Sequence, residues 1–268
     1  MKYIESRHNP LYKEWIRNRR LAGRQGHPVW LEGPHLCESW LINEHPLQWL
    51  IVDEARRDLP EINSLIQMVQ IRGQSDQILA LNTQLFKNLS DVPSQQGVLL
   101  IAPKLQQALP QSLTQSVVVL DGVQDPGNVG VILRISAAVG VGTIITQSGT
   151  AACWSPKVLR SAQGAHSGLQ IVEDVDVVVW LSDYRREANR LPILVTTLEE
   201  ASDLYATKLP DQGIWVFGHE GQGVSPELTA LADLRIRIDH STQYVESLNV
   251  GVAAALCLFE QQRQGRHS

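Results

Sequence analysis

Apolar and polar positions change along the first hundred residues in blocks that are typical of an α/β segment. Short apolar runs suit strands, and amphipathic stretches between them suit helices. The predicted strands are residues 28–32, 48–53, 69–71 and 96–102. The predicted helices are residues 9–22, 33–45, 60–68 and 76–88.

The same alternation resumes in the second half, with strands that are continuous apolar runs. Such strands are typical of a mostly parallel sheet that helices cover on both faces. The predicted strands are residues 117–121, 143–147, 193–197, 213–218 and 234–238. The predicted helices are residues 128–139, 156–164, 177–189, 225–232 and 247–262.

Residues 103–116 separate the two patterns, with two prolines, many glutamines and little apolar content. This composition is typical of a linker. We therefore expect a small α/β domain over residues 1–102, a linker over 103–116 and a larger α/β domain over 117–268.

Composition narrows the class of protein. Of the 268 residues, 43% are hydrophobic and 19% are charged, as in ordinary globular proteins. No apolar run approaches the ~20 residues of a membrane span, and the N-terminus lacks the apolar core of a signal peptide. Neither the three scattered cysteines nor the histidines have metal-ligand spacing. We expect a soluble, cytoplasmic protein with no metal site and no membrane partner.

Charge is unevenly distributed along the chain. The net charge is −5, yet residues 1–24 carry seven basic and two acidic side chains, a sum of +5, so the remainder sums to −10. A basic segment on an acidic body suits contact with phosphate, although a solvated helix face explains it equally well. The basic residues are Lys2, Arg7, Lys13, Arg17, Arg19, Arg20 and Arg24.

The segment LDGVQDPGNVGVILRISAAVGVG (120–142) carries one charge in an apolar run. A turn follows Asp121, and Asn128 suits the N-cap of a helix that is apolar nearly all round and is predicted to be buried. A buried guanidinium at Arg134 needs an anionic partner or a cleft. A structural salt bridge would meet that need as well as a functional site would.

Two further segments place polar residues beside glycine or small residues. WVFGHEGQGVSPEL (215–228) is a glycine-rich strand-to-helix loop around Glu220, with Ser225 as the predicted N-cap. It has neither dinucleotide nor P-loop spacing, which argues against a dehydrogenase. YVESLNVGVAAALCLFE (244–260) predicts a helix capped by Ser247, with Asn249 beside it, that packs on the sheet or on a second copy. Plain capping remains an alternative for these polar residues.

Together and in this order, the three segments resemble the motifs of the SpoU/TrmH family of RNA ribose 2′-O-methyltransferases, within the SPOUT superfamily. DGVQDPGNVGVILRISAAVGVG is similar to the first motif, VFGHEGQGVS to the second and VESLNVGVAAALCLFE to the third. SPKVLRSAQGAHSGLQI (155–171) resembles the segment between them. The resemblance covers about residues 116–262 and extends more loosely to the N-terminal part, which is similar to a small RNA substrate-binding domain.

The resemblance implies a deep trefoil knot in the C-terminal domain, a homodimer through that domain, and S-adenosylmethionine held mainly by backbone. By motif position the cofactor contacts are Gly218, Ile238 and Leu248, with Thr196 at a preceding strand end. The RNA would contact the basic N-terminal segment; ribosomal RNA is expected in preference to tRNA, which stays the alternative. The residues expected there are Arg7, Lys13, Arg17 and Arg20.

The chemistry that the resemblance implies would explain why a charged side chain stands at Arg134. S-adenosylmethionine carries an electrophilic methyl group, and a ribose 2′-hydroxyl attacks it only when positioned and relieved of its proton. A free arginine has a pKa above ~12, so we expect Arg134 to orient the ribose or its phosphate rather than act as a base. The resemblance assigns Asn128, Glu220, Ser247 and Asn249 to fixing Arg134 and the ribose.

One stretch departs from the family pattern. The third motif usually begins Ile-Pro-Met-x-Gly, whereas this chain reads Ile238-Asp239-His240-Ser241-Thr242-Gln243 and is one residue longer before Ser247. Loss of the proline removes rigidity from a loop that should border the cofactor. The alternative function is therefore an RNA-binding relative with weak or lost methyl transfer.

Overall fold

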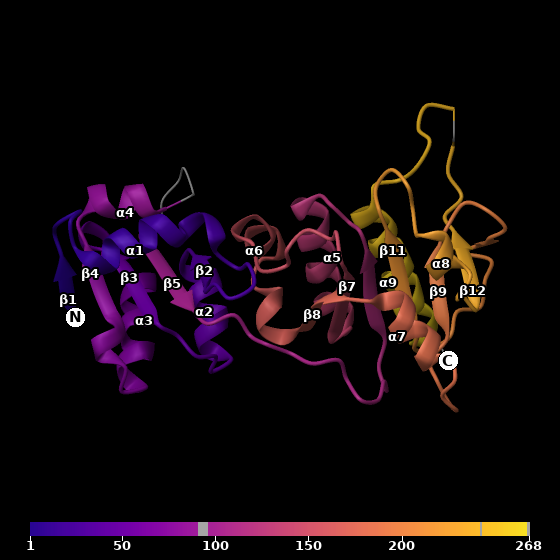
Figure 1. Ribbon diagram of the computed structural model, residues 1–268, viewed down its shortest axis with the longest axis horizontal. Coiled ribbons are helices and arrows are strands. Elements are labelled where there is room, and N and C mark those ends of the chain that lie inside the picture. Colours follow the sequence, from indigo (N-terminus) through magenta and orange to yellow (C-terminus); the bar gives the residue numbers. More distant parts are fainter. Residues whose placement is uncertain (91–95, 242, 267–268) are drawn as a thin grey trace. The chain divides into compact units, whose positions relative to one another are not determined.

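A computed structural model of the chain describes residues 1–90, 96–241 and 243–266. The chain divides into two compact units (Figure 1). The first unit comprises Met1–Leu105 and Trp154–Ser167, and the second comprises Gln106–Cys153 and Gly168–Ser268. Residues 103–116 contain neither helix nor strand. Within the described ranges, no helix is both long and apolar enough to cross a membrane.

The first unit is built on a five-stranded mixed sheet. The strand order is β1 (Lys2–Ile4), β4 (Ile78–Leu81), β3 (Trp49–Asp53), β5 (Val98–Ala102) and β2 (Val29–Glu32). β1, β4 and β3 run parallel, and β5 is antiparallel to both of its neighbours. The predicted strands over 28–32, 48–53 and 96–102 are confirmed.

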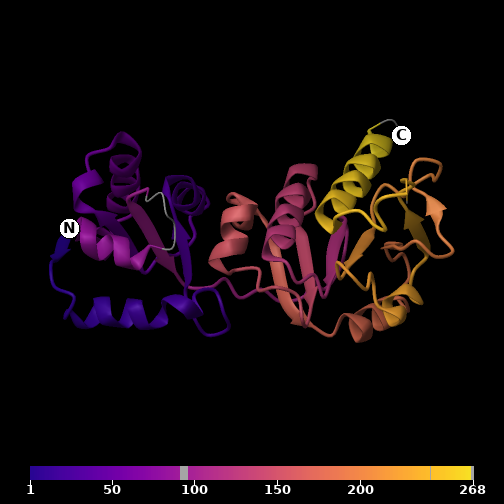
Figure 2. The same cartoon turned by 90° about the horizontal axis from the view of Figure 1, so that it is seen from above.

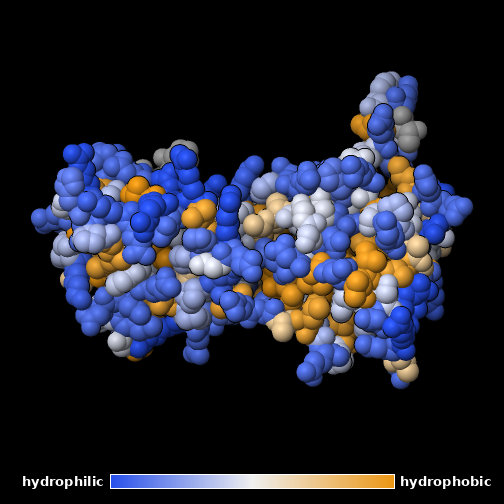
Figure 3. Space-filling model, viewed as in Figure 1, coloured by the Kyte–Doolittle hydropathy of each residue, from blue (hydrophilic) through white to orange (hydrophobic). Residues whose placement is uncertain are grey.

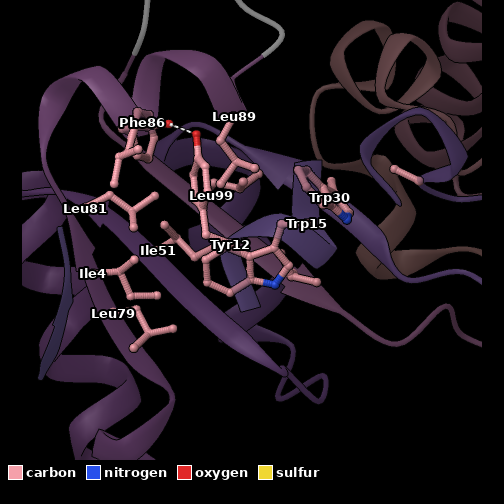
Figure 4. Packing of buried hydrophobic residues seen from close by; sticks show 13 residues of the cluster. Ile4, Tyr12, Trp15, Trp30, Ile51, Leu79, Leu81, Phe86, Leu89 and Leu99 are labelled. Carbon is pink, nitrogen blue, oxygen red and sulfur yellow. Dashed lines mark hydrogen bonds between the residues drawn. The ribbon is translucent and has the colours of Figure 1, made fainter. Parts of the chain in front are cut away.

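Helices α1 (Pro10–Asn18) and α4 (Thr83–Leu89) pack against this sheet through one apolar cluster (Figure 4). Tyr12 and Trp15 of α1 meet Phe86 of α4 and Ile51 of β3 there. The Tyr12 hydroxyl, which is buried, donates a hydrogen bond to the Leu85 carbonyl oxygen at 3.1 Å. Burial of its aromatic residues therefore orients α1, leaving the opposite side of that helix to solvent.

Two predictions in this unit are wrong. Residues 69–71 are not a strand but the last turn of α3 (Pro60–Ile71), which packs on α2 (Pro34–Ile42). Residues 76–88 are not one helix, because Ile78–Leu81 forms β4 and lies fully buried between two strands. Pairing and burial override local propensity there. Asn82 then starts α4 by accepting a hydrogen bond from the Leu85 N–H at 2.9 Å.

The segment Trp154–Ser167 joins the first unit although it lies between two strands of the second. Its helix α6 (Pro156–Ala162) contacts β2. Trp154 has no exposed surface and meets Trp40 edge to face, with ring centroids 6.1 Å apart. A Cβ atom on Gly23 would lie 1.8 Å from the Trp154 carbonyl oxygen, so only glycine permits this approach.

The second unit is built on a seven-stranded sheet in which every pairing is parallel. The strand order is β10 (Ser202–Asp203), β12 (Leu234–Arg237), β9 (Ile193–Thr196), β11 (Ile214–Gly218), β6 (Val117–Asp121), β7 (Thr143–Gln147) and β8 (Gln170–Val175). The predicted parallel sheet is confirmed. The sequence analysis did not predict β8, in which three of six residues are polar, or β10, which consists of two polar residues.

Helices cover both faces of this sheet (Figure 2). α5 (Pro126–Val139) and α9 (Val250–Gly265) pack together on one face, and α7 (Val177–Tyr184) and α8 (Pro226–Thr229) lie on the other. The chain between β12 and α9 projects as a loop (Figure 1), and its surface is mostly polar (Figure 3). Tyr244 in this loop is 86% exposed.

We predict that Trp154→Ala lowers the free energy of unfolding of the first unit by about 3–5 kcal/mol, because it empties a fully buried indole site. Urea unfolding followed by amide hydrogen exchange in β2, β3 and β5 measures this. Ile71→Ala is the control: that side chain is 86% exposed, so its loss should change stability by less than about 0.5 kcal/mol. Equal stability of the two variants would contradict the assignment of Trp154 to this core.

Candidate active site

The carboxyl ends of the two central strands of the second unit carry the glycine-rich loop. Gly218 ends β11 beside Asp121 of β6. The chain then folds back on itself, and His219 and Gly223 exchange two backbone hydrogen bonds of 2.9 Å. A Cβ atom on Gly218 would lie 2.2 Å from the Gly223 carbonyl carbon and oxygen. Only glycine therefore lets this loop close.

Asp121 fixes the far end of the same loop. Its carboxylate is 9% exposed and accepts a hydrogen bond from the Ser225 N–H at 2.7 Å. Ser225 directly precedes α8, but its side chain makes no capping hydrogen bond. The prediction that the Ser225 hydroxyl caps this helix is therefore wrong; Ser225 instead contributes its backbone N–H, which the Asp121 carboxylate binds.

Glu220, at the tip of the loop, joins it to the chain that follows β6. Its carboxylate accepts hydrogen bonds from the Gln124 N–H at 3.1 Å and the Asp125 N–H at 3.0 Å. It also accepts one from Asn128 Nδ2 at 2.9 Å. Asn128 Oδ1 in turn accepts from Asn249 Nδ2 at 2.9 Å. Three of the five predicted catalytic residues thus form one polar network that connects all three motifs.

The ionisation of Glu220 follows from these contacts. Burial alone would raise its pKa, but hydrogen bonds from the Asn128 side chain and from the Asp125 and Gln124 amides outweigh it and lower the pKa to about 2. Glu220 is therefore an ionised carboxylate at neutral pH. Its role in this geometry is that of an anchor for N–H donors rather than a proton acceptor.

The helix caps differ from prediction in a way that serves this network. Asp125, not Asn128, caps α5, accepting from the Gly127 and Asn128 amides at 2.7 and 3.0 Å. Asn249, not Ser247, caps α9, accepting from the Gly251 and Val252 amides at 2.9 and 3.2 Å. The α5 cap lies three residues before the predicted Asn128, which leaves the Asn128 side chain available to Glu220 and Asn249.

A cavity of about 700 Å³ opens beside the glycine loop. This size suits a small-molecule ligand. The four predicted cofactor residues, Thr196, Gly218, Ile238 and Leu248, all line it, and so do Glu220 and Ser247. The cavity walls come from the ends of β9, β11 and β12, from the loop 219–224, and from the start of α9.

Arg134 lies elsewhere. Its side chain is exposed on α5, less than two turns and about 9 Å along the helix axis from Asn128. Among the described residues it makes no hydrogen bond or ion pair, and it is not part of the cavity wall. The prediction that α5 is buried all round is wrong for a single chain: α9 and the sheet cover one side, while Val131 is 39% exposed.

Sequence reasoning missed several polar residues of the cavity wall. His219 Nδ1 accepts hydrogen bonds from the Gly221 and Gln222 amides at 2.9 and 3.2 Å, which shapes the loop tip. Arg235, Arg237 and His240 also line the cavity. The alternation in LRIRI (234–238) was a signal for the two arginines, since side chains two apart on a strand share one face.

The predicted RNA-binding residues lie in the first unit. Arg7, Lys13, Arg17 and Arg20 are all exposed, on α1 or at its ends. Asn9 caps this helix by accepting from the Leu11 and Tyr12 amides at 2.9 and 3.3 Å. The four basic residues are thus displayed to solvent by a helix whose buried face is fixed in the core, and their role remains a prediction.

A parallel α/β unit with a cavity at the carboxyl ends of its strands, walled by a glycine loop, is the class of architecture that binds a nucleotide-like ligand. The model of the SpoU rRNA Methylase family matches residues 115–259, more than half of the chain. The chain belongs to this family.

Relatives and solved structures agree with the family match. A 23S rRNA (guanosine(2553)-2′-O)-methyltransferase, RlmP of Bacillus subtilis, is 26% identical over 97% of this chain and 98% of its own length. A 23S rRNA (guanosine-2′-O-)-methyltransferase, RlmB of Neisseria meningitidis, is 32% identical over 54% of this chain and 57% of its own. The structure of an RNA 2′-O ribose methyltransferase has a TM-score of 0.79 and 25% identity, over 98% of both chains. A TrmH-family protein of Porphyromonas gingivalis has a TM-score of 0.77 and 28% identity, over 94% of this chain and 97% of its own.

We predict that Gly218→Ala lowers the free energy of unfolding of the second unit by about 1–3 kcal/mol, because the added methyl group forces the Gly223 backbone away. Thermal and urea unfolding measure the change. Gly221→Ala is a control in the same loop: its Cβ atom would meet the His219 ring at an ordinary 3.7 Å, and it should cost less than about 0.5 kcal/mol. A Gly218→Ala protein as stable as the Gly221→Ala protein would refute the close approach.

Proposed function

We propose that this chain transfers the methyl group of S-adenosylmethionine to a ribose 2′-hydroxyl of RNA. The observation that carries the proposal is the juxtaposition of the 700 Å³ cavity with the Glu220–Asn128–Asn249 network, in a chain of the SpoU rRNA Methylase family. A cavity for the methyl donor and a polar cluster for the acceptor are the two parts that a transfer enzyme requires.

The cavity fits the cofactor in chemistry as well as in size. Gly218, Ile238 and Leu248 all line the cavity, so a ligand there can reach their backbone groups. The Glu220 carboxylate, held ionised by its N–H donors, places a negative charge on the cavity wall, which suits a cationic sulfonium. When bound, S-adenosylmethionine supplies an electrophilic methyl group.

The residues of the chain then have to hold the acceptor ribose. Ser247 lies on the cavity wall, and Asn249 links the start of α9 to Asn128. Because Glu220 accepts a hydrogen bond from Asn128 Nδ2, the network is already ordered before the substrate binds. Binding then costs less conformational entropy. Arg134 orients the ribose or its phosphate in this proposal, and Ser247 and Asn249 hold the hydroxyl near the methyl group.

A homodimer through the second unit would explain the exposed position of Arg134. The face formed by α5 and α9 presents apolar side chains: Val131, Val252 and Phe259 are 39%, 51% and 48% exposed. Arg134 follows Val131 by three residues and so lies on the same helix face. We propose that a second copy covers this face, and that Arg134 acts across or beside the interface.

Ribosomal RNA is the proposed substrate in preference to tRNA. Two relatives carry names that specify 23S rRNA, and one of them matches 97% of this chain. The first unit, with Arg7, Lys13, Arg17 and Arg20 exposed, is proposed as the RNA substrate-binding domain, the second as the methyltransferase domain, and residues 103–116 as their linker. Cytoplasmic location would follow from such a substrate.

The proposed trefoil knot concerns the chain between β12 and α9. β12 pairs with β9, yet α9 packs on α5 and β11. We propose that the chain linking these two elements passes through a knot beside the carboxyl ends of β9 and β11. A knot is rare among folds and would make the cavity wall at Ile238 and Leu248 part of the crossing itself.

The alternative is an RNA-binding relative without transfer activity. The departure at residues 239–243 favours it, and Thr242 lies outside the described residues. Nevertheless, Ile238 and Leu248 on either side of this stretch both line the cavity. We therefore favour the active enzyme.

We predict that S-adenosylmethionine alone, without RNA, binds the purified protein with micromolar affinity. Isothermal titration calorimetry measures this directly. Binding would justify mapping methylated riboses in RNA from cells that lack the gene. Absence of binding, both alone and with RNA added, would favour the non-catalytic RNA-binding alternative.

We predict that Arg134→Ala abolishes methyl transfer to RNA while changing the affinity for S-adenosylmethionine by less than about twofold, since Arg134 is not part of the cavity wall. Arg134→Lys, which keeps the charge but not the planar fork, should retain partial transfer. Sedimentation velocity on both variants separates loss of chemistry from loss of the dimer. Undiminished turnover by Arg134→Ala would remove this residue from the mechanism.

A further inference from the structure

Ile238 lines the cavity but lies just beyond the end of strand β12, outside the paired part of the sheet. β12 ends at Arg237, which pairs with Asp203 of β10 and accepts a hydrogen bond from the Leu204 N–H at 2.9 Å. Ile238 is the next residue and lines the cavity. Beyond it the chain enters the projecting polar loop (Figures 1 and 3), where exposed residues offer little packing. Something other than the strand ladder must set the direction of the Ile238 peptide.

The His240 ring makes that contact. His240 Nδ1 lies 2.8 Å from the Ile238 carbonyl oxygen. A carbonyl oxygen only accepts, so Nδ1 carries the proton in this arrangement. The ring itself lines the cavity. His240 Nε2 is buried and has no hydrogen-bond partner among the described residues, so the Ile238 carbonyl is the polar contact that holds the ring.

The neighbouring ion pair is a weaker support. Arg237 Nε lies 2.7 Å from Asp239 Oδ1, with the two side chains 43% and 63% exposed. Arg237 Nη1 also donates to the Ala201 carbonyl oxygen at 3.1 Å. Exposed ion pairs of this kind contribute little because solvent screens them. The His240–Ile238 contact, which is half-buried, is therefore the stronger of the two restraints on the loop base.

We propose that His240 is a positioning residue for the cofactor cavity: through Nδ1–H it fixes the Ile238 carbonyl, and thereby the part of the cavity wall that Ile238 forms. The inference rests on the proposed function, because it assigns this cavity to S-adenosylmethionine. It also explains a role for His240 in the stretch that departs from the family motif: its side-chain hydrogen bond restrains the backbone at Ile238.

Calorimetric titration of the full-length protein with S-adenosylmethionine tests the proposal. His240→Ala removes the donor and should weaken binding about three- to tenfold, the effect of losing one hydrogen bond, with unchanged stoichiometry. His240→Asn restores it, because Asn Nδ2 stands at the same distance from the backbone as His Nδ1, and should bind within twofold of the unsubstituted protein. Ser241→Ala, in the same exposed loop, is the control and should not change affinity.

His240→Gln provides a second disruption in a polar side chain, because its amide lies one bond further out; it should bind as weakly as His240→Ala. Equal affinities of His240→Ala and the unsubstituted protein would overturn the inference while leaving the proposed function intact. A His240→Asn protein as weak as His240→Ala would also overturn it, since the Nδ1 contact would then not be the operative one. Failure of the unsubstituted protein to bind would instead overturn the proposed function, and this inference with it.

Discussion

The hydrogen bonds accepted by Glu220 are the constraint on which the rest of the site depends. One carboxylate ties the tip of the glycine loop to the amides of Gln124 and Asp125 and to the Asn128 side chain. Because these are charge-assisted bonds to an ion that stays deprotonated, they hold through the pH range of a living cell. Asn128 in turn accepts a hydrogen bond from Asn249, and Asn249 caps α9. One hydrogen-bonded network thus holds together segments that lie about a hundred residues apart in the sequence.

This network can form because the backbone at Gly223 approaches Gly218 closely. The loop 219–223 closes on the strand end with no room for a side chain, and the two hydrogen bonds between His219 and Gly223 hold it there. The Asp121 carboxylate restrains the loop where α8 begins. Backbone hydrogen bonds and the Asp121 carboxylate together hold the loop that forms part of the cavity wall, which suits recognition of a ligand by shape and hydrogen bonding.

The architecture and the location of the site could be predicted from the sequence, but not every contact within the site. The apolar runs 117–121 and 213–218 predicted buried parallel strands because such strands must be covered on both faces. The run 78–81 was missed because only its neighbours β1 and β3 make it a strand. Asn128 and Asn249 were found as polar residues at helix starts, yet which residue capped which helix depended on distances that spacing does not give. Arg134 was predicted to be buried because a sequence shows how apolar a helix is, but not what covers it.

The segment Trp154–Ser167 makes the first unit discontinuous in sequence. The chain passes between the units three times, after Leu105, after Cys153 and after Ser167, so neither unit can be cut out as a single stretch. The family match over residues 115–259 includes this excursion. A chimera that exchanged the first units of two relatives at the 103–116 boundary would pair one protein's sheet with the other protein's α6 and Trp154. The first unit is therefore formed by two stretches of chain, and both have to be exchanged together if it is to keep its own packing.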